Sequence, residues 1–475
     1  MSYIRHKTRQ GKKYAYEVTS YWDPEMKRSR QKTTYMGAVT EAGDILPRGQ
    51  NKYIKESMIL DFGEGFCLHR FMEQLPLYKT LGLVLTKKEL KEVIPLIFYR
   101  ISMASAMHNC ERWLEGTVLQ HFYSGADLSS QNISRILANL GREALQRDFF
   151  RHHLESSGGT KKSVIIDATA LPNQIQTGFS AWGYSDGGVE KQFRLLCVLD
   201  SETKRPLFYR YLPGNLADVS TLEQTISELD KMGIQNSFTL MDAGYFSEGN
   251  VHALYHRKID FLTRLPAGRA LYKNLLMTEV SDLESPQYAA KYGSRGLFAK
   301  ALEIDLFGQK GFAYLILDPA RKGKEMNALL LQAAEESKDN KAPQIDALDF
   351  NKCGVMVLVS SKKIEPSEVV SCYYMRQSVE QVFGFCKDDL NLLPIRRHNE
   401  ATIRGYLFLQ FLALIFFIEL REKLLNLCTV EQGLMTLRNL KCKVFDKELL
   451  VSEATKKQKE LFDQLAIMVP MKLGI

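Results

Sequence analysis

Several features that mark particular classes of protein are missing from this sequence of 475 residues. No two of its eight cysteines have the C-x-x-C spacing of a zinc site, and none are closely paired as in a disulfide framework. They lie at positions 67, 110, 197, 353, 372, 386, 428 and 442. The first residues, MSYIRHKTRQGKK, are polar and basic, with no apolar core of a secretory signal after them. We therefore expect reduced thiols and a cytoplasmic protein.

Long hydrophobic runs are also missing. The one stretch that could suggest a membrane span is Tyr406–Ile418, YLFLQFLALIFFI, which lies between Arg404 and Glu419. Its 13 residues fall short of the ~20 that a helix needs to cross a bilayer, so we expect a buried core helix and no membrane partner. With 14 prolines and 31 glycines, the composition also argues against long disordered or collagen-like segments.

The charge that is present is unevenly placed. The chain has 63 Lys and Arg against 55 Asp and Glu, a net charge of +8. Residues 1–55 alone hold 12 basic and 5 acidic residues, which is +7 and leaves +1 for all the others. A basic segment attached to a nearly neutral body favours a polyanionic partner.

The first 158 residues show two different patterns. Residues 1–55 alternate polar and aromatic positions around a turn at Asp23-Pro24, which predicts a small β-hairpin with a basic exposed face. That face would carry Lys27, Arg28, Arg30 and Lys32. Residues 56–158 have helical spacing and end in a linker-like SSGG segment. A stretch capped by Ser129 or Ser130 predicts either part of a helix-turn-helix or a plain packing helix.

After the linker, strands and helices alternate. KKSVIIDATA predicts a buried strand ending at Asp167, and KQFRLLCVLD with PLFYRYLPGN predicts an antiparallel hairpin. A helix from Asp218 to Gly233, a strand ending at Asp242, the helix SEGNVHALYHRK and the extended segment IDFLTRLP follow. The order strand, strand, strand, helix, strand, helix, strand predicts an α/β fold with a mixed sheet flanked by helices.

Two aspartates occupy equivalent places in this pattern. Asp167 and Asp242 each end an apolar strand, and small residues follow both. If the two strands are neighbours, their carboxylates converge at one edge of the sheet, where α/β proteins build sites. Such a pair, with a third acid, suits a hard divalent ion such as Mg²⁺. Two unrelated aspartates that make turns explain the pattern equally well.

A third acid comes from the segment PSEVVSCYYMRQSVEQVFGFCK, residues 366–387. Pro366 and Glu368 favour a helix start, and the length predicts about six turns. At 100° per residue, four polar side chains fall within an arc of about 60°, apart from the apolar stripe. They are Tyr373, Arg376, Glu380 and Lys387. A solvated polar face is the usual cause of such a stripe, but it rarely combines one acid, two cations and a phenol.

These residues resemble a known family. Asp167, Asp242 and Glu380 are similar to the DDE triad of bacterial insertion-sequence transposases with a ribonuclease H-like fold. The spacing Tyr373-x2-Arg376-x3-Glu380-x6-Lys387 resembles the YREK signature of the insertion sequence four family. Four further segments support the resemblance, namely IIDATA, PGNLADVSTL, MDAGYFS and RRHNEATIRGYLFLQFLAL, and the basic hairpin resembles the start of one branch of the family.

The resemblance implies a function. It is that of a transposase that binds the terminal inverted repeats of an insertion sequence, cleaves DNA strands and transfers them to target DNA. Asp167, Asp242 and Glu380 would hold two Mg²⁺ ions, with Mn²⁺ able to substitute. Tyr373, Arg376 and Lys387 would contact the double-stranded DNA of the transposon end. A homodimer in the synaptic complex and a nucleoid-associated location in a bacterial cytoplasm are also implied.

The distance between the second and third acids indicates an insertion. The 137 residues between Asp242 and Glu380 exceed by ~100 what a strand, a helix and usual connections need. GLFAKALEIDLF, GQKG and FAYLILD predict a β-hairpin inside it, so we expect a β-rich subdomain. The expected regions are a basic hairpin (1–55), a helical DNA-binding region (56–158), a catalytic domain (159–266 and 352–425), the insertion (267–351) and a C-terminal helical region (426–475).

Two features depart from the family pattern. Some relatives stack a flipped base on a tryptophan of the insertion, but the tryptophans here are Trp22, Trp113 and Trp182. Base flipping and a hairpin intermediate are therefore not carried over from the family, and the route of second-strand cleavage stays open. The segment GYSDGG carries Asp186 where relatives often have a basic residue, and no role is predicted for this acid.

Two other functions compete with this one. A transposase that has lost catalysis would act as a DNA-binding repressor, although all three acids and the complete YREK face argue against it. A ribonuclease H-like nuclease would hydrolyse nucleic acid without strand transfer. Metal-dependent cleavage of DNA that carries the transposon ends would exclude the repressor. Strand-transfer products would exclude the nuclease.

Overall fold

A computed structural model describes most of the chain. The described residues are 2–9, 12–39, 43, 45–47, 58–103, 105–158, 161–185, 188–338, 347–395, 399–445 and 448–474. They form two compact units. The N-terminal unit comprises residues 1–60, 441–453 and 470–475, and the main unit comprises residues 61–440 and 454–469. Asp186, whose role was left open, lies outside the described residues.

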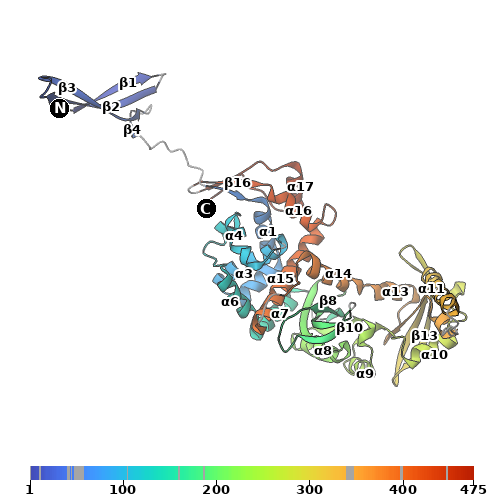
Figure 1. The fold of residues 1–475 in the computed structure, drawn as a ribbon. Coiled ribbons are helices and arrows are strands. Elements are labelled where there is room, and N and C mark those ends of the chain that lie inside the picture. Colours follow the sequence, from blue (N-terminus) through green and yellow to red (C-terminus); the bar gives the residue numbers. More distant parts are fainter. Residues whose placement is uncertain are drawn as a thin grey trace. The chain divides into compact units, whose positions relative to one another are not determined.

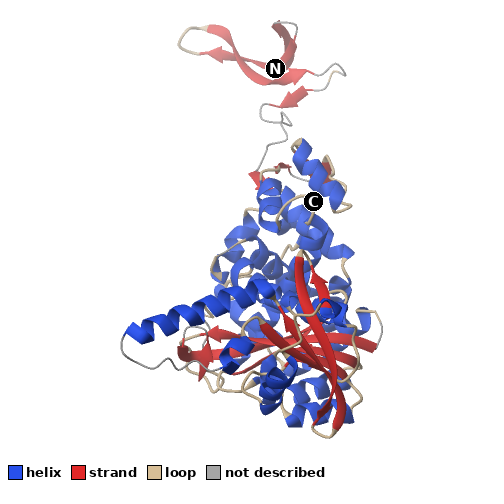
Figure 2. Ribbon diagram, turned by 90° about the vertical axis from the view of Figure 1, so that its right-hand side faces the viewer, coloured by secondary structure: helices blue, strands red, loops and turns tan. Residues whose placement is uncertain are grey.

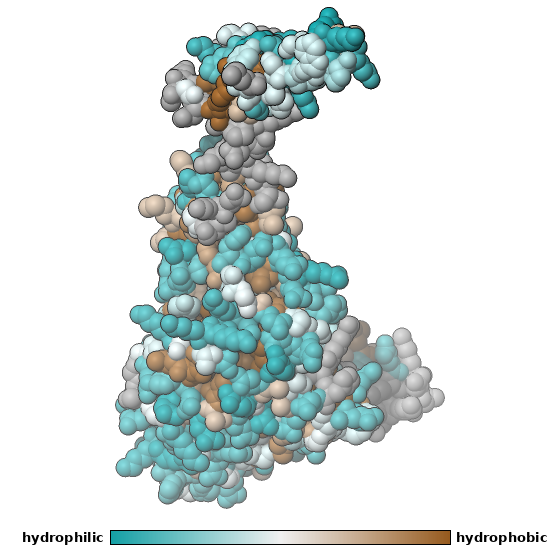
Figure 3. Space-filling view, turned by 90° about the vertical axis from the view of Figure 1, so that its left-hand side faces the viewer, coloured by the Kyte–Doolittle hydropathy of each residue, from teal (hydrophilic) through white to brown (hydrophobic). Residues whose placement is uncertain are grey.

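The N-terminal unit is built from two four-stranded sheets. The first contains the expected hairpin, β2 (Lys12–Asp23) and β3 (Arg28–Val39), flanked by β1 (Ser2–Arg9) and β4 (Ile45–Pro47) (Figure 1). The four basic residues predicted on its face are all exposed, and hydrophilic side chains cover most of the sheet in Figure 3. The expected hairpin is therefore confirmed and is part of a larger sheet.

The second sheet corrects the prediction for the C-terminal region. Residues 426–475 were expected to be helical, and α16 (Val430–Arg438) and α17 (Lys456–Gln464) are helices. The same region also forms β16 (Lys441–Phe445), β17 (Glu448–Val451) and β18 (Lys472–Gly474), which join β5 (Met58–Asp61). KCKVF and ELLV alternate polar and apolar residues, which suits a strand with one buried face.

Residues 63–156 of the main unit are helical, as the spacing predicted. The helices are α1 (Gly63–Gln74), α2 (Pro76–Val84), α3 (Lys87–Ser102), α4 (Cys110–Glu115), α5 (Leu119–Phe122), α6 (Ser130–Leu140) and α7 (Glu143–Ser156). Ser129 caps α6 by accepting a hydrogen bond from the Asn132 N–H. Helix α6 crosses α15 (Glu400–Leu424) where Gly141 and Gly405 let the two backbones touch, so it packs into the core.

A mixed sheet of ten strands forms the centre of the main unit among the described residues. Its order is β12-β13-β14-β15-β11-β10-β6-β8-β7, and β9 also pairs with β8. The strands that match the sequence prediction are β6 (Lys161–Pro172), β8 (Gly188–Asp200), β9 (Pro206–Pro213), β10 (Gln235–Met241) and β11 (Asp260–Arg264). The predicted helices between them are α8 (Leu222–Lys231) and α9 (Glu248–His256). The predicted α/β order is confirmed, and the edge strand β7 (Ala181–Ser185) was not predicted.

The β-rich insertion extends this sheet. Strands β12 (Ala289–Tyr292), β13 (Arg295–Leu306) and β14 (Gln309–Leu317) pair in succession, and β14 pairs with β15 (Val355–Ser360). Helices α10 (Ala270–Glu279), α11 (Pro319–Lys338) and α12 (Ala347–Lys352) accompany them. Figure 2 shows these strands and the helices around them. The insertion is thus continuous with the central sheet through β15.

Helix α15 contains the apolar stretch Tyr406–Ile418. Among the described residues it is the one helix long and apolar enough to cross a membrane, yet 83% of its most apolar 18-residue window is buried inside the protein. The rings of Phe408, Phe411 and Phe416 pack against aromatic residues of the helices and strands around them. The expectation of a buried core helix is confirmed.

Candidate active site

The two aspartates lie side by side because their strands are parallel neighbours. Strand β10 pairs with β6 in a register that places Met241 beside Ile166. Asp167 and Asp242, each the next residue, therefore reach the same edge together. One detail of the prediction is wrong, since β6 does not end at Asp167. It continues to Pro172 because β8 goes on pairing with it after the pairing with β10 stops.

Neighbouring groups fix the backbone after Asp242. Its carbonyl oxygen accepts a hydrogen bond from the buried Thr263 hydroxyl at 3.0 Å. The 3₁₀ turn η3 (Ala243–Tyr245) follows, and the side-chain amide of Asn250 donates to the Tyr245 carbonyl at 2.8 Å. The same amide donates to Val219 at 2.9 Å. Asn250 thereby ties the segment after Asp242 to the turn that precedes α8.

The segment with the third acid forms two consecutive helices, which Figure 1 shows on the other side of β8 and β10 from α8 and α9. These are α13 (Pro366–Tyr374) and α14 (Gln377–Gly384), followed by a π-helical turn at Phe385–Asp389. We expected one regular helix over 366–387, and the structure corrects this. The amides of Arg376 and Val379 bond to carbonyls three residues back, which makes the junction a tight 3₁₀ segment.

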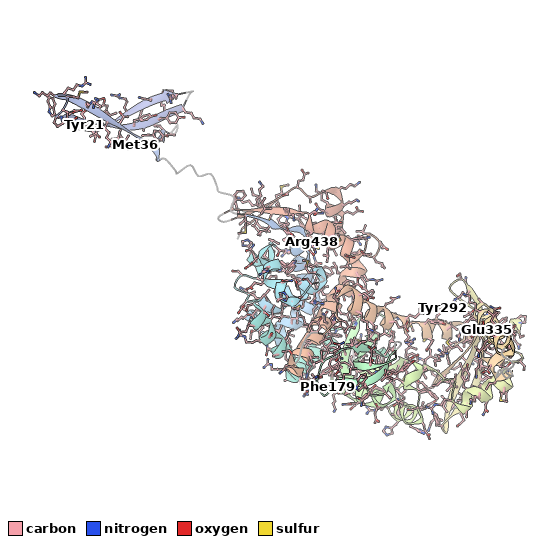
Figure 4. All side chains as sticks on the ribbon, viewed as in Figure 1. Tyr21, Met36, Phe179, Tyr292, Glu335 and Arg438 are labelled. Carbon is pink, nitrogen blue, oxygen red and sulfur yellow. The ribbon has the colours of Figure 1, made fainter. Side chains whose placement is uncertain are left out.

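A ring stack holds α13 beside the insertion. The rings of Tyr374 and Tyr292 are stacked with centroids 4.7 Å apart, and Tyr292 is labelled in Figure 4. Tyr292 is the last residue of β12, so the strands of the insertion support the helix that leads to Glu380.

Arg376 lies at the centre of the three acids. Its Nη1 is 2.6 Å from Asp167 Oδ2, and its Nη2 is 2.7 Å from Glu380 Oε1. Its Nε is 3.8 Å from Asp242 Oδ1, which is an ion-pair distance but too long for a hydrogen bond. The Arg376 side chain is 18% exposed, whereas that of Glu380 is 52% exposed. One guanidinium thus joins all three predicted acids.

The other two residues of the predicted face also point to this edge. The Tyr373 hydroxyl donates to Asp242 Oδ1 at 3.3 Å, a long hydrogen bond. The Lys387 ammonium donates to the Thr169 hydroxyl at 2.8 Å, two residues beyond Asp167 on β6. The structure therefore brings together all six residues that the sequence singled out.

Burial and charge alter the acid–base properties of the cluster. Burial raises the pKa of Asp167 to about 6, although the nearby Arg376 guanidinium opposes the rise. Burial and the negative charge of Asp242 raise the pKa of Tyr373 to about 12. Arg376 stays charged, because its three acidic neighbours outweigh burial and raise its pKa further.

The donor set suits a divalent ion, although Arg376 stands among the donors. Carboxylate oxygens are the ligands that Mg²⁺ and Mn²⁺ prefer. Within the described ranges, no three His, Cys, Asp or Glu side chains are close enough together to hold one ion. At this site the guanidinium lies between the acids and neutralises part of their charge. The three carboxylates therefore fit a divalent ion by their chemistry, with the Arg376 guanidinium between them.

An ion pair that the sequence did not predict lies beside the site. Arg194 Nη2 of β8 is 2.6 Å from Asp218 Oδ1, at the start of the turn before α8. A Cβ at Gly244 would lie 2.9 Å from Asp218 Oδ2, so Asp218 packs directly against the segment after Asp242. The negative charge of Asp242 contributes to a raised pKa of Asp218, after burial as the larger cause. PGNLADVSTL contained the signal, but the helix prediction explained Asp218 as a helix start.

Comparison with protein-family models identifies a family. Residues 158–416, more than half of the chain, match the family model described as a transposase DDE domain. All three acids of the site lie inside this range. No curated protein matches the sequence.

Two solved structures are distantly similar. The piggyBac transposase synaptic complex with hairpin DNA shares 11% identity at a TM-score of 0.39, covering 87% of this chain and 81% of that chain. The Drosophila P element transposase strand transfer complex shares 10% identity at a TM-score of 0.22, covering 82% and 84%. Likeness at this level carries no inference about partners or chemistry.

Proposed function

Because this chain belongs to the transposase DDE domain family, we propose that it is an active transposase of the insertion sequence four type. It would bind the terminal inverted repeats of an insertion sequence, cleave DNA strands with Mg²⁺ and join them to target DNA. The observation that carries the proposal is the convergence of Asp167, Asp242 and Glu380 on one edge of the sheet. One acid, two cations and a phenol at the predicted spacing over residues 373–387, close to the two aspartates, also support the YREK assignment.

Asp167, Asp242 and Glu380 are the residues that would hold the divalent ions, which this family generally uses. Two bound Mg²⁺ ions, with Mn²⁺ as a substitute, would activate the attacking water or 3′-hydroxyl and stabilise the leaving oxygen. Asp167 is buried on β6, and Thr263 holds the backbone carbonyl of Asp242, the residue that follows β10, so both aspartates are held in place before DNA arrives.

Arg376, Lys387 and Tyr373 would position the DNA. The planar fork of an arginine binds two phosphate oxygens at once, and a lysine ammonium acts as a point charge. The Tyr373 hydroxyl would donate a further hydrogen bond. These groups would set the scissile phosphate against the acids, and none of them would form a covalent intermediate.

The remaining parts would recognise and assemble the ends. The basic sheet of the N-terminal unit and the helices of residues 56–158 would contact the terminal repeats. A homodimer would pair the two ends, and the protein would act at the nucleoid of a bacterial cytoplasm.

A transposition assay tests the proposal. The substrate is a supercoiled plasmid that carries the coding region with its natural flanking DNA, mixed with a target plasmid and Mg²⁺ or Mn²⁺. We expect cuts at the flanking repeats and joined donor–target molecules, both abolished by EDTA. Binding without cuts would instead identify a repressor. Efficient cuts with no joined product would identify a nuclease without strand transfer.

A further inference from the structure

The centre of the candidate site is held by one side chain of the protein itself. The Arg376 guanidinium contacts an oxygen of each acid, two of them at hydrogen-bond distance. Divalent ions held by these acids would need the same oxygens. Arg376 and the ions therefore cannot bind the three acids in the same way at the same time.

We propose that Arg376 is a built-in competitor of the metal ions, which a DNA phosphate must draw away before the ions bind fully. The inference rests on the proposed function, because it assigns the regulation of that same site. Metal loading then depends on DNA, and the protein without DNA keeps its acids neutralised.

Both carboxylate oxygens of Asp167 already accept hydrogen bonds from the protein. Its Oδ1 accepts a hydrogen bond from the Ala168 N–H at 2.8 Å, and its Oδ2 accepts from Arg376 at 2.6 Å. The carboxylate is buried, so water cannot easily replace either donor. A metal ion at Asp167 must displace the Arg376 donor and would be repelled by its positive charge if the guanidinium stayed nearby.

Arg376 is also placed to leave. The site does not satisfy every N–H donor of Arg376, because the buried Nε of this residue has no hydrogen-bond partner in the described structure. Its backbone lies in the 3₁₀ junction between α13 and α14, and short 3₁₀ stretches inside helices often serve as hinges. A phosphate offers the guanidinium two parallel, charge-assisted hydrogen bonds, which the carboxylates here do not.

Lys387 provides a matched comparison. It carries the same charge within the same predicted signature, and its ammonium donates to the Thr169 hydroxyl at 2.8 Å. Neutralising Lys387 removes a nearby positive charge, whereas neutralising Arg376 removes such a charge and also frees oxygens of the acids. The two effects can thus be separated.

The test measures Mn²⁺ affinity of the full chain from the paramagnetic resonance signal of free Mn²⁺, with no cleavage involved. Without DNA, R376Q is expected to bind Mn²⁺ about tenfold or more tightly than the wild type, the scale of a lost charge-assisted hydrogen bond. K387Q is expected to change the affinity by about threefold or less, since it removes a nearby charge whose hydrogen bond is made to the Thr169 hydroxyl. Adding a mixed-sequence DNA duplex should tighten Mn²⁺ binding to the wild type and have a much smaller effect on R376Q.

Three outcomes would overturn the proposal: R376Q binding Mn²⁺ no better than the wild type, equal gains in R376Q and K387Q, or a DNA effect that persists in R376Q. The DNA effect on the wild type needs no substitution, so its absence also counts against the proposal if R376Q fails to fold. The variant D167N distinguishes a failure of this inference from a failure of the proposed function. If D167N binds Mn²⁺ as the wild type does, the acids are not the metal site and the proposed function fails. If D167N loses binding but R376Q gains none, only the competition fails.

Discussion

At the scale of single residues, the site is an acidic cluster set by a few short contacts. Asp167 and Asp242 owe their proximity to the register of two strands, and Glu380 is joined to them by one arginine. Displacing one acid by an ångström can slow phosphoryl transfer by orders of magnitude. Residues that hold the acids without touching DNA should therefore matter for the rate.

Asp218 is such a positioning residue. D218N keeps the shape of the side chain but weakens the ion pair with Arg194, which holds residue 218 against Gly244. We expect the rate of cleavage at saturating DNA to fall about 10- to 100-fold while the DNA concentration for half-maximal rate stays within about twofold.

A control for D218N lies on the neighbouring helix. D230N breaks an ion pair of the same length, 2.6 Å, between Asp230 and Arg257. This pair lies at the end of α8 and should leave the cleavage rate unchanged. Equal rates for D218N and the wild type, or a loss confined to DNA affinity, would contradict the positioning role.

The sequence predicted which residues meet but not how they meet. The helical period places Tyr373, Arg376, Glu380 and Lys387 in one direction, and the strand ends place the two aspartates. A period gives the direction of a side chain and not its reach, so it could not show that Arg376 would occupy the centre. The pair Arg194–Asp218 escaped prediction because its residues are 24 positions apart and meet only through the sheet.

At the scale of elements, α15 packs against α3, α6, α16 and β9, and at its crossing with α6 the two backbones come very close. A Cβ at Gly405 would lie 1.7 Å from the carbonyl oxygen of Leu137, and one at Gly141 would lie 2.0 Å from that of Ala401. No side chain fits between backbones this close, so glycine is required at both positions.

G405A should therefore destabilise the protein strongly. We expect a loss of about 3 kcal/mol or more in the free energy of unfolding, at the upper end of overpacking effects. G249A, where a Cβ would meet nothing within 4 Å, should change stability by less than about 1 kcal/mol. Urea denaturation of both variants checks this, and a G405A protein as stable as G249A would show that the helices do not cross as described.

His153 of α7 makes the stability of the protein depend on pH. His153 stacks on Phe149, packs edge-on against Phe411 of α15 and donates its Nε2–H to the Pro206 carbonyl at 2.9 Å. Burial lowers its pKa below the usual 6.5, and the hydrogen bond opposes this in part. Below pH 6.5 the unfolded chain binds the proton more readily than the folded protein does, so stability is lost as pH falls.

H153Q removes this titration. The loss of unfolding free energy between pH 7.5 and 5.5 should be smaller in H153Q than in the wild type, whatever the substitution costs at neutral pH. Denaturation at the two pH values measures this difference. A wild-type loss that H153Q retains in full would assign the pH dependence to other groups.

Several elements differed from the sequence prediction for local reasons. The end of β6 could not be predicted from the sequence, because residues 168–172 are extended through their pairing with β8. The break between α13 and α14 at Arg376 could not be predicted, because the sequence has no proline or glycine there and Met375 and Arg376 both favour a helix. The insertion was expected from its length, but its continuity with the main sheet depends on β15, whose apolar sequence is consistent with several partners.

At the scale of the whole molecule, the charges separate two tasks. Residues 1–55 carry +7 of the net +8, while the main unit gathers acids at one edge of its sheet. DNA attraction would then come mostly from the basic sheet and from single residues such as Arg376 and Lys387, and phosphoryl transfer from the acidic edge.

Removing residues 1–55 tests this division. The truncated chain should keep the melting temperature of the main unit, bind DNA more weakly and lose affinity less steeply with rising salt, because fewer counterions are released. Titrations of labelled duplex at several salt concentrations give the slope. An unchanged slope would place the basic contacts in the main unit and contradict the division.

The central claim is that Asp167, Asp242 and Glu380 act together in metal-dependent cleavage of DNA. Its most direct test compares D167N, D242N and E380Q with the wild type for two quantities, duplex affinity and the rate of strand cleavage in Mn²⁺. We expect each variant to retain DNA affinity within about threefold and to lose cleavage by about a thousandfold or more, as for residues that act as a unit. Normal cleavage by any one of the three variants would contradict the account.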